Sequence, residues 1–325
     1  HMPSSLPGES SRFRYDVITF GETMIRFSPN AGQMLEQSDF LRADAAGTES
    51  NMAAALARLG ADVAWVSVLP DDPVGRWITS RLAGHGVDIS YVVRSNERVG
   101  VFFLESGREP RGTRVVYDRS GSGASEMTPD VVGPALKSGA RIVHTSGITA
   151  SLGPKCLETV SRVLAERSEG GYRTSFDINY RAKLWPVERA RSVLSRLLGQ
   201  VDILISTAAD TALIFGMDGR PEETIGALQD LFSNEIVVIT LAEGGAVGWS
   251  KDTGFLYTKP YVVEPVDRLG AGDAFDAGLL YGLLYEDLST GLSYGTALSA
   301  LSYSDRGDIT WSTLDEVKRM IRLTD

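Results

Sequence analysis

Short apolar runs alternate with amphipathic stretches along most of the chain. The runs predict buried strands over residues 15–20, 63–69, 141–145, 174–178, 201–206 and 235–241. Apolar positions at helical spacing predict helices over residues 51–59, 73–84, 154–169, 187–198, 210–215, 224–232, 273–285, 289–303 and 313–321. Strands that are apolar throughout and alternate with helices are typical of a parallel sheet covered on both faces. The pattern therefore predicts an α/β fold with a mostly parallel central sheet.

Two regions depart from this rhythm. Residues 24–41 and 99–117 show stricter alternation of apolar and polar positions, broken by turn residues. Such alternation predicts short strands that project from the main sheet. They could form a flap over an active site, or surface hairpins without a role, and periodicity alone leaves both open.

The composition is that of a soluble globular protein. The chain has 325 residues with 43% hydrophobic content, enough for one large α/β domain with at most a small appendage. Residues 1–14 are polar and are expected to be a disordered tail that begins with a tag remnant. No apolar run reaches transmembrane length, so a cytoplasmic location is expected.

Charge and cysteine content narrow the possible partners. The formal net charge of −10 argues against nucleic acid or an anionic membrane as a partner. An anionic small molecule would need specific arginines to overcome this field. The single cysteine, Cys156, excludes a disulfide framework or a thiolate metal site.

The most informative segment is VDRLGAGDAFDAG, from Val266 to Gly278. Gly270 and Gly272 allow a tight turn whose N–H groups could converge on one anion at the start of an apolar helix. Asp273 would then lie beside a bound phosphate, where it could accept a proton from an attacking hydroxyl. The alternative is an ordinary helix start with an Asp cap.

Two nucleotide-binding motifs and one catalytic motif can be excluded. No lysine follows a glycine, which excludes a Walker A loop, and Phe275 stands where a dinucleotide fingerprint needs its third glycine. Ser293 in GLSYG matches a nucleophile elbow, but a polar loop precedes it and both native histidines lie before it in the chain. Ser293 is therefore expected in a helix.

Polar residues at the ends of other apolar segments are further candidates. Asn51 lies at the start of an alanine-rich helix, where it could cap the helix or bind sugar hydroxyls. Arg119 and Arg181 each follow an apolar segment, at the edge where open α/β sheets place ligands. They could clamp a carboxylate or lie unengaged on the surface.

These residues together resemble the ribokinase-like (PfkB-type) carbohydrate kinases, and within them the 2-keto-3-deoxygluconate kinases. The motifs GETMIRFSP, GTESN, RVGVFFLESG, VVYDRSGSGASEMTP, HTSGIT, DINYRAKLW and VDRLGAGDAF occur in the order and spacing of that family. The resemblance implies one kinase domain over residues 15–325, with a doubly wound central sheet. It also implies a small β lid built from strands in about residues 24–45 and 99–119.

The resemblance also implies roles for individual residues. Asp273 matches the catalytic base, and Gly270, Ala271 and Gly272 match the backbone anion hole. The positions that match sugar contacts are Gly47, Asn51, Phe102, Tyr117, Arg119 and Arg181. Those that match the nucleotide site are Thr240, Ala242 and Gly245, together with Gly270 and Gly272.

The implied cofactors are ATP and Mg²⁺, with a monovalent cation such as K⁺ left open. Asp210 stands where the family has a glutamate of the magnesium and phosphate network, and Thr207 replaces the asparagine of that motif. Phe102 replaces a frequent tyrosine, Ala242 a glycine, and Arg268 a small residue. These departures bear on nucleotide affinity and sugar identity more than on fold or reaction type.

The expected activity is ATP-dependent phosphorylation of the 6-hydroxyl of 2-keto-3-deoxygluconate. A kinase for a neutral sugar such as fructose or ribose is the alternative among enzymes. A catalytically silent sugar and nucleotide sensor is the alternative from another class. Unpaired lid edges lead us to expect a homo-oligomer.

Overall fold

An eight-stranded central sheet organises the molecule. The computed structural model describes residues 13–107, 110–241 and 245–323. The strand order is β14-β13-β12-β11-β10-β9-β1-β4. The six parallel strands are β1 (Tyr15–Phe20), β4 (Val63–Val66), β9 (Ala140–Ser146), β10 (Arg173–Asp177), β11 (Ile203–Thr207) and β12 (Ile236–Thr240). The antiparallel hairpin β13 (Ala246–Ser250) and β14 (Gly254–Thr258) completes one edge.

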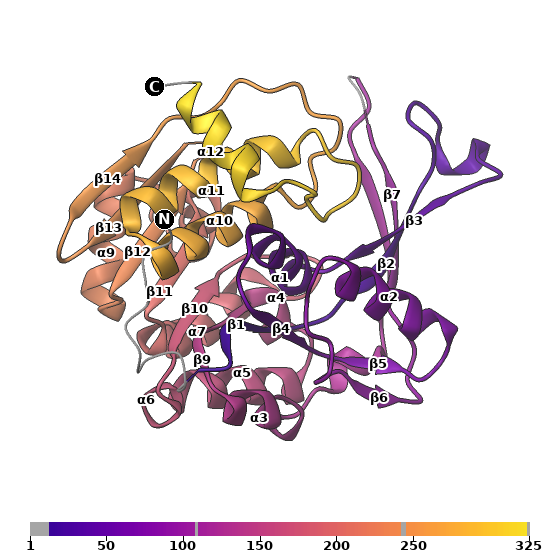
Figure 1. Ribbon diagram of the computed structural model, residues 1–325, viewed down its shortest axis with the longest axis horizontal. Coiled ribbons are helices and arrows are strands. Elements are labelled where there is room, and N and C mark those ends of the chain that lie inside the picture. Colours follow the sequence, from indigo (N-terminus) through magenta and orange to yellow (C-terminus); the bar gives the residue numbers. More distant parts are fainter. Residues whose placement is uncertain (1–12, 108–109, 242–244, 324–325) are drawn as a thin grey trace.

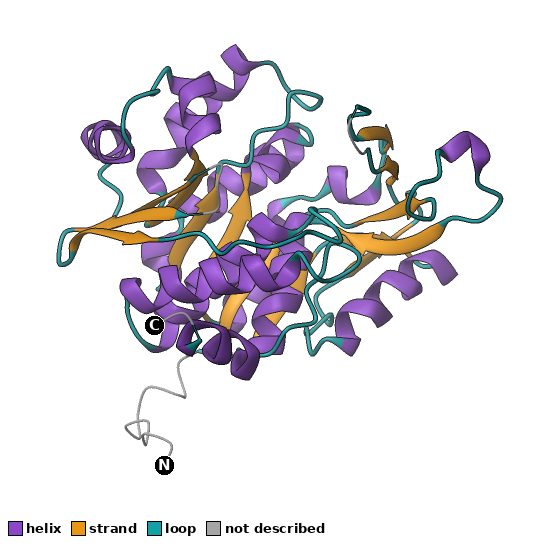
Figure 2. Ribbon diagram, turned by 90° about the horizontal axis from the view of Figure 1, so that it is seen from above, coloured by secondary structure: helices purple, strands orange, loops and turns teal. Residues whose placement is uncertain are grey.

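Both faces of this sheet are buried, which explains the apolar strands. In β11, for example, Ile203 and Ile205 belong to one hydrophobic cluster and Leu204 to the other. Figure 2 shows the strands between two layers of helices. The predicted α/β fold with a mostly parallel, doubly wound sheet is confirmed.

The two helical layers differ in their origin along the chain. One layer combines N-terminal and C-terminal helices: α1 (Thr48–Leu59), α2 (Pro73–Gly84), α10 (Ala271–Tyr285), α11 (Leu288–Ser302) and α12 (Leu314–Arg322). The other layer contains α3 (Pro129–Ser138), α4 (Gly147–Ser151), α5 (Pro154–Ala165), α7 (Val187–Leu197), α8 (Ala208–Phe215) and α9 (Pro221–Phe232). Because α1 packs on α10, the start of the chain meets its last third (Figure 1).

Some expected elements differ in detail. The strand expected over 63–69 ends at Val66, and β5 (Val68–Pro70) leaves the sheet to pair with β6 (Val93–Ser95). The helix expected over 154–169 breaks at Glu166 into α5 and the short α6 (Arg167–Gly170). In the first case the apolar pattern runs through the break, because both β4 and β5 are buried throughout.

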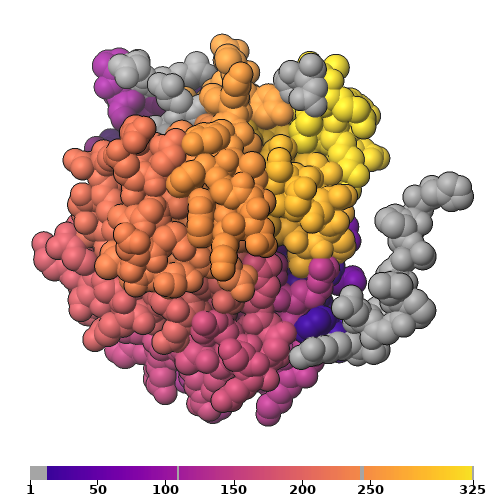
Figure 3. Space-filling view, turned by 90° about the vertical axis from the view of Figure 1, so that its left-hand side faces the viewer, coloured from indigo at the N-terminus to yellow at the C-terminus, as the bar shows by residue number. Residues whose placement is uncertain are grey.

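The β13–β14 hairpin and α3 were not expected from the sequence. Helix α11 covers the hairpin, and both form the end of the molecule seen in Figure 3. Gly248 lies in the middle of β13 because a Cβ there would approach the Leu292 side chain to 2.8 Å. Helix α3 escaped prediction because Gly133 and Pro134 interrupt its helical pattern.

The two strand-rich regions form a separate four-stranded sheet, called the small sheet below. Its order is β3 (Arg42–Ala46), β2 (Met24–Ser28), β7 (Val101–Glu105) and β8 (Arg114–Asp118). The small sheet projects from the central sheet beside α1 (Figure 1). The expected lid strands are therefore present, and closure over a substrate stays a prediction. Most of the expected tail at residues 1–14 lies outside the described residues.

In the described residues, no helix combines the length and apolar character that crossing a membrane requires. Ser293 lies within α11, as expected, where its hydroxyl donates to the Ser289 carbonyl at 3.1 Å. Cys156 is buried in α5.

Candidate active site

The N-terminus of α10 forms the centre of the site. Gly270 precedes the helix with a φ of +83°, and a Cβ there would lie 1.9 Å from the Asp308 carbonyl oxygen. No side chain caps the helix, so the N–H groups of its first turn remain available to a ligand. A Cβ on Gly272 would meet no heavy atom within 4 Å. Gly270, Ala271 and Gly272 thus present an open, positively polarised turn that suits an anion.

Asp273 is held in the first turn of α10 by side chains from α1. The Asn51 amide donates to its Oδ2 at 2.8 Å, and the Thr48 hydroxyl donates to its Oδ1. Asn179, after β10, donates to the Thr48 hydroxyl at 3.2 Å. Burial raises the pKa of Asp273 against the lowering effect of these donors and of Arg181. A fixed carboxylate with a raised pKa has the properties of a general base.

Asn51 serves this carboxylate and does not cap its own helix. Helix α1 begins at Thr48 with Gly47 at the cap position, and the Gly47 N–H donates to the Asn51 side-chain oxygen at 3.3 Å. A Cβ on Gly47 would lie 2.2 Å from the Glu22 carbonyl oxygen, so only glycine fits there. The capping alternative for Asn51 is therefore wrong.

Glu49 is a buried support that the sequence did not reveal. Its carboxylate accepts hydrogen bonds from Ser146, the last residue of β9, at 2.6 Å and from Thr149 of α4 at 2.7 Å. Burial raises its pKa to about 7. Glu49 thereby connects the first turn of α1 to the carboxyl end of β9. These hydrogen bonds fix the position of the α1 residues that hold Asp273.

A cluster of carboxyl groups lies next to Asp273. Burial, with the charges of Asp210 and Asp273, raises the pKa of Asp177 to about 7. Asp276, one helical turn from Asp273, is buried and hydrogen-bonded to Asp177, and its pKa is raised well above the ordinary range. Burial and the charges of Asp177 and Asp273 thus favour the protonated form of Asp276.

Arg181 is the cation that faces this cluster. Its guanidinium lowers the pKa of Asp177, Asp210 and Asp273 against the larger raising effect of burial. Among the described residues its hydrogen-bond partner is the neighbouring Tyr180 carbonyl, at 3.0 Å, and no carboxylate of these residues lies within ion-pair distance. The Arg181 guanidinium is thus available to a ligand.

Asp210 joins the first turn of α8 to the loop after β10. Its Oδ2 accepts from the Tyr180 N–H at 3.1 Å, and its own N–H donates to the Thr207 hydroxyl at 3.0 Å. Thr207 thereby caps α8, a role that the family's asparagine could also fill. No group of three or more His, Cys, Asp or Glu side chains disposed to hold a metal ion occurs in the described part of the chain.

The small sheet supplies an aromatic wall. Phe102 is buried and packs against the half-exposed Tyr117 ring, with centroids 5.5 Å apart. The Arg119 guanidinium lies 5.7 Å from the Tyr117 ring centroid and pairs with the buried Glu22 carboxylate. Arg119 is therefore engaged inside the protein, unlike Arg181.

Lys183 is a further residue that the sequence reasoning missed, although it lies in the DINYRAKLW motif. Its ammonium donates to the Val115 carbonyl at 2.9 Å and lies 5.3 Å from the Tyr117 ring centroid. Lys183 connects the loop that carries Arg181 to the edge strand β8 of the small sheet.

The residues expected to bind the nucleotide lie at the far end of the same sheet edge. Thr240 ends β12 beside Thr207 of β11, and Gly245 accepts the Leu241 N–H at 2.9 Å. A Cβ on Gly245 would lie 2.8 Å from the Thr258 carbonyl oxygen. Ala242 lies outside the described residues. Arg268, on the turn before α10, is exposed.

Comparison with known proteins identifies the family. Residues 15–315 match the model of the pfkB family of carbohydrate kinases. The chain belongs to this family. It is an ATP-dependent carbohydrate kinase, and the resemblance seen in its motifs is confirmed.

Individual kinases are similar over nearly the full chain. A 2-dehydro-3-deoxygalactonokinase of Haloferax volcanii is 38% identical over 309 residues, which cover 94% of this chain and 96% of that protein. A 2-dehydro-3-deoxygluconokinase of Thermoproteus tenax is 32% identical over 306 residues, 92% of each. The crystal structure of 2-dehydro-3-deoxygluconokinase from Thermotoga maritima superposes with a TM-score of 0.88 at 32% identity, over 94% of this chain and 99% of that one.

Proposed function

We propose that this kinase transfers the γ-phosphoryl group of ATP to the primary 6-hydroxyl of 2-keto-3-deoxygluconate. One observation carries the choice of an acidic sugar: Arg181 faces the site beside Asp273 and has no carboxylate partner among the described residues. In a protein of net charge −10, such a cation is well suited to a substrate carboxylate. The names of the relatives from Haloferax and Thermoproteus support the same class of substrate.

The residues at the site fit a bound nucleotide phosphate. Helix α10 has no side-chain cap, and Gly272 leaves open space over its first turn. Bound there as its Mg²⁺ complex, ATP would supply the phosphoryl group and the metal would offset its negative charge. Asp210 would contribute a carboxylate to the metal network, and Thr240 and Gly245 would border the nucleotide.

Asp273 performs the proton transfer in this mechanism. Its carboxylate accepts the proton of the sugar hydroxyl while the oxygen forms a bond to the γ-phosphorus, and the bond to the leaving ADP oxygen breaks. The N–H groups of Gly270, Ala271 and Gly272 stabilise the charge on the transferring group. Asn51 and Thr48 hold the base at the mouth of this turn.

The sugar acid lies between Arg181 and the small sheet. Arg181 binds the carboxylate, and Tyr117 and Phe102 border the carbon chain. Arg119 reaches the sugar from its ion pair with Glu22, so its contact is weaker than that of Arg181. Gly47 provides close backbone approach at the start of α1. The small sheet covers the bound sugar and excludes water that would hydrolyse ATP.

The test is ADP release with Mg²⁺ and ATP against 2-keto-3-deoxygluconate, its galactonate epimer, gluconate, fructose, ribose and adenosine. We expect turnover with the two keto-deoxy acids and little with the others. Preference for a neutral sugar would agree with kinase activity but contradict the proposal that the substrate is a sugar acid. ATP binding without any ADP release, in wild type and Asp273→Asn alike, would favour the sensor alternative.

A further inference from the structure

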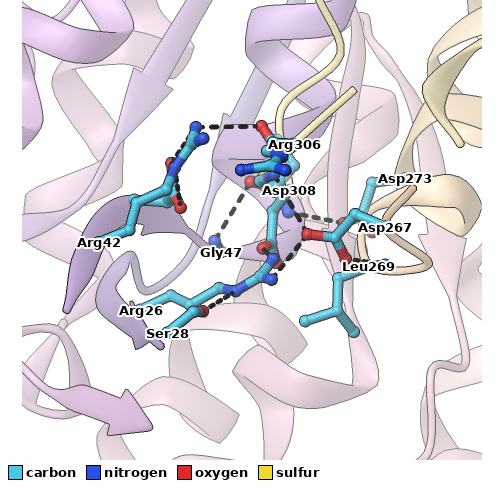
Figure 4. Close-up of polar contacts among 12 residues, drawn as sticks. Arg26, Ser28, Arg42, Gly47, Asp267, Leu269, Asp273, Arg306 and Asp308 are labelled. Carbon is cyan, nitrogen blue, oxygen red and sulfur yellow. Dashed lines mark hydrogen bonds and ion pairs between the residues drawn. The ribbon is translucent and has the colours of Figure 1, made fainter. Parts of the chain in front are cut away.

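Arg26 is a buried cation outside the residues discussed so far. It lies on β2 of the small sheet, and only 4% of its side chain is exposed. Its guanidinium donates to Asp267 at 2.6 Å, to Asp308 at 2.8 Å and to the Ser28 hydroxyl at 2.9 Å. Figure 4 shows it extending from the small sheet to both carboxylates, with Leu269 and Asp273 beyond them.

Both carboxylates come from chain segments that enclose the proposed phosphate-binding turn, Gly270 to Gly272. Asp267 Oδ1 accepts the Leu269 N–H at 3.1 Å, and its Oδ2 accepts the Gly307 N–H at 3.2 Å. The Asp308 carbonyl oxygen occupies the space where a side chain on Gly270 would lie. Arg26 thus contacts the two segments that enclose Gly270 from either side.

A second contact between the small sheet and this turn is apolar. Leu269 packs against a cluster on the small sheet that includes Met24 and Phe102. This contact and the ion pairs join the same two parts of the molecule, so the position of the small sheet and the shape of the turn are linked.

We propose that Arg26 is a positioning residue that fixes the Gly270–Gly272 turn for phosphoryl transfer and couples it to the small sheet. This inference rests on the proposed function of the turn. Two largely buried carboxylates would repel each other and any phosphate nearby, and the single positive charge of the guanidinium, which both carboxylates share, offsets part of this repulsion and holds them in place. Its three nitrogens bond to Ser28, Asp308 and Asp267 separately, a geometry that the single nitrogen of a lysine does not reproduce.

The first test needs no substrate. Hydrogen-exchange mass spectrometry compares peptides spanning residues 266–276 in wild type, Arg26→Lys and Arg42→Met. Arg42 is the matched control, because it pairs with Asp44 on the adjacent strand β3 but is 47% exposed and has no contact with Asp267 or with the Asp308 carboxylate. We expect exchange in this segment to speed up about tenfold or more in Arg26→Lys only. Unchanged exchange in Arg26→Lys, or equal acceleration in both variants, would overturn the proposal.

The second test measures catalysis with whichever sugar the ADP-release panel identifies. Arg26→Lys should lower kcat about tenfold or more with little change in the sugar KM, because the turn acts on the transferring phosphoryl group. An effect confined to the sugar KM, or a kcat within twofold of wild type, would contradict this role. If the panel finds no substrate, the proposed function fails while the exchange experiment still decides on Arg26.

Chemical rescue separates positioning from general damage. Asp308, one of the two carboxylate partners of Arg26, lines a cavity of about 260 Å³ that also borders Arg42 and Asp44. Guanidinium chloride well below denaturing concentrations should restore part of kcat in Arg26→Ala and none in Asp273→Asn. Failure of rescue in a folded Arg26→Ala enzyme would count against the proposal.

Discussion

At the scale of single residues, the setting of Asp273 accounts for its proposed role. Two donors from α1 fix both of its carboxylate oxygens, and burial raises its pKa. The first effect orients the group and the second makes it a better proton acceptor. Neither depends on the identity of the sugar, so both can be tested separately from substrate choice.

Replacement of the base is the first prediction. Asp273→Asn keeps the shape of the side chain but cannot accept the proton, so kcat should fall about 100-fold or more with nearly unchanged sugar binding. Steady-state kinetics and calorimetric titration measure the two effects. Asp287→Asn, at the N-cap of α11, is the matched control and should keep wild-type kcat. Near-normal turnover of Asp273→Asn would remove Asp273 from the mechanism.

The pH dependence of the rate gives the second prediction. The Thr48 hydroxyl lowers the pKa of Asp273, so Thr48→Val should raise that pKa further. The base must be deprotonated to act, and the acid limb of the kcat/KM profile should therefore move to higher pH. An unshifted acid limb in Thr48→Val would show that another group controls it.

Sequence reasoning predicted most residues of the candidate site but not the contacts between them. Motifs place Gly270, Asp273 and Asn51 because helix starts and glycine turns have local signatures. The bond from Asn51 to Asp273 joins residues 222 positions apart, and the ion pair from Arg119 to Glu22 spans 97. Local patterns carry no information on such contacts, so the engagement of Arg119 could not be foreseen.

At the scale of elements, two glycines at the start of α10 should differ in how much a substitution destabilises the fold. Gly270→Ala should destabilise the fold by about 2 kcal/mol or more, because it combines a positive φ with a collision against the Asp308 carbonyl. Gly272→Ala has open space and a helical backbone, so its stability should stay within about 1 kcal/mol of wild type. Urea unfolding measures both, and equal losses would contradict this view of the turn.

The sequence predicted best the elements whose apolar pattern is uninterrupted. The central parallel strands and α2 follow from continuous apolar runs and from a Pro start with helical spacing. The β13–β14 hairpin was missed because glycines interrupt its apolar pattern: Gly248 lies inside β13, where Leu292 of α11 leaves no room for a side chain, and Gly254 begins β14. Packing against another element can thus determine residue types in a strand and remove the alternation from which the strand would be predicted.

At the scale of the whole molecule, a buried histidine predicts acid sensitivity. His144 lies within β9, and burial lowers its pKa to about 3 from an ordinary 6.5. The unfolded chain therefore takes up a proton below pH 6.5 that the native state does not, and stability falls as pH falls. Between pH 7 and 5, His144→Gln should lose about 2 kcal/mol less than wild type in denaturant unfolding. Equal losses of unfolding free energy in wild type and His144→Gln would contradict the attribution of this acid sensitivity to His144.

The assembly state remains a prediction. Strands β3 and β8 are the edges of the small sheet, and β8 carries the exposed Val116. Pairing at either edge would bury such groups and produce the expected homo-oligomer. Sedimentation velocity measures it, and a monomer at all concentrations would contradict it.

The most direct test of the account is the ratio of kcat/KM for 2-keto-3-deoxygluconate to that for fructose, in wild type and Arg181→Ala. We predict that wild type strongly favours the acid. Loss of the charge-assisted contact should lower its kcat/KM about 10- to 100-fold, mainly through KM, and leave fructose unchanged. A wild-type preference for fructose, or an Arg181→Ala effect equal for both sugars, would contradict the central claim that Arg181 selects an acidic sugar for phosphorylation at Asp273.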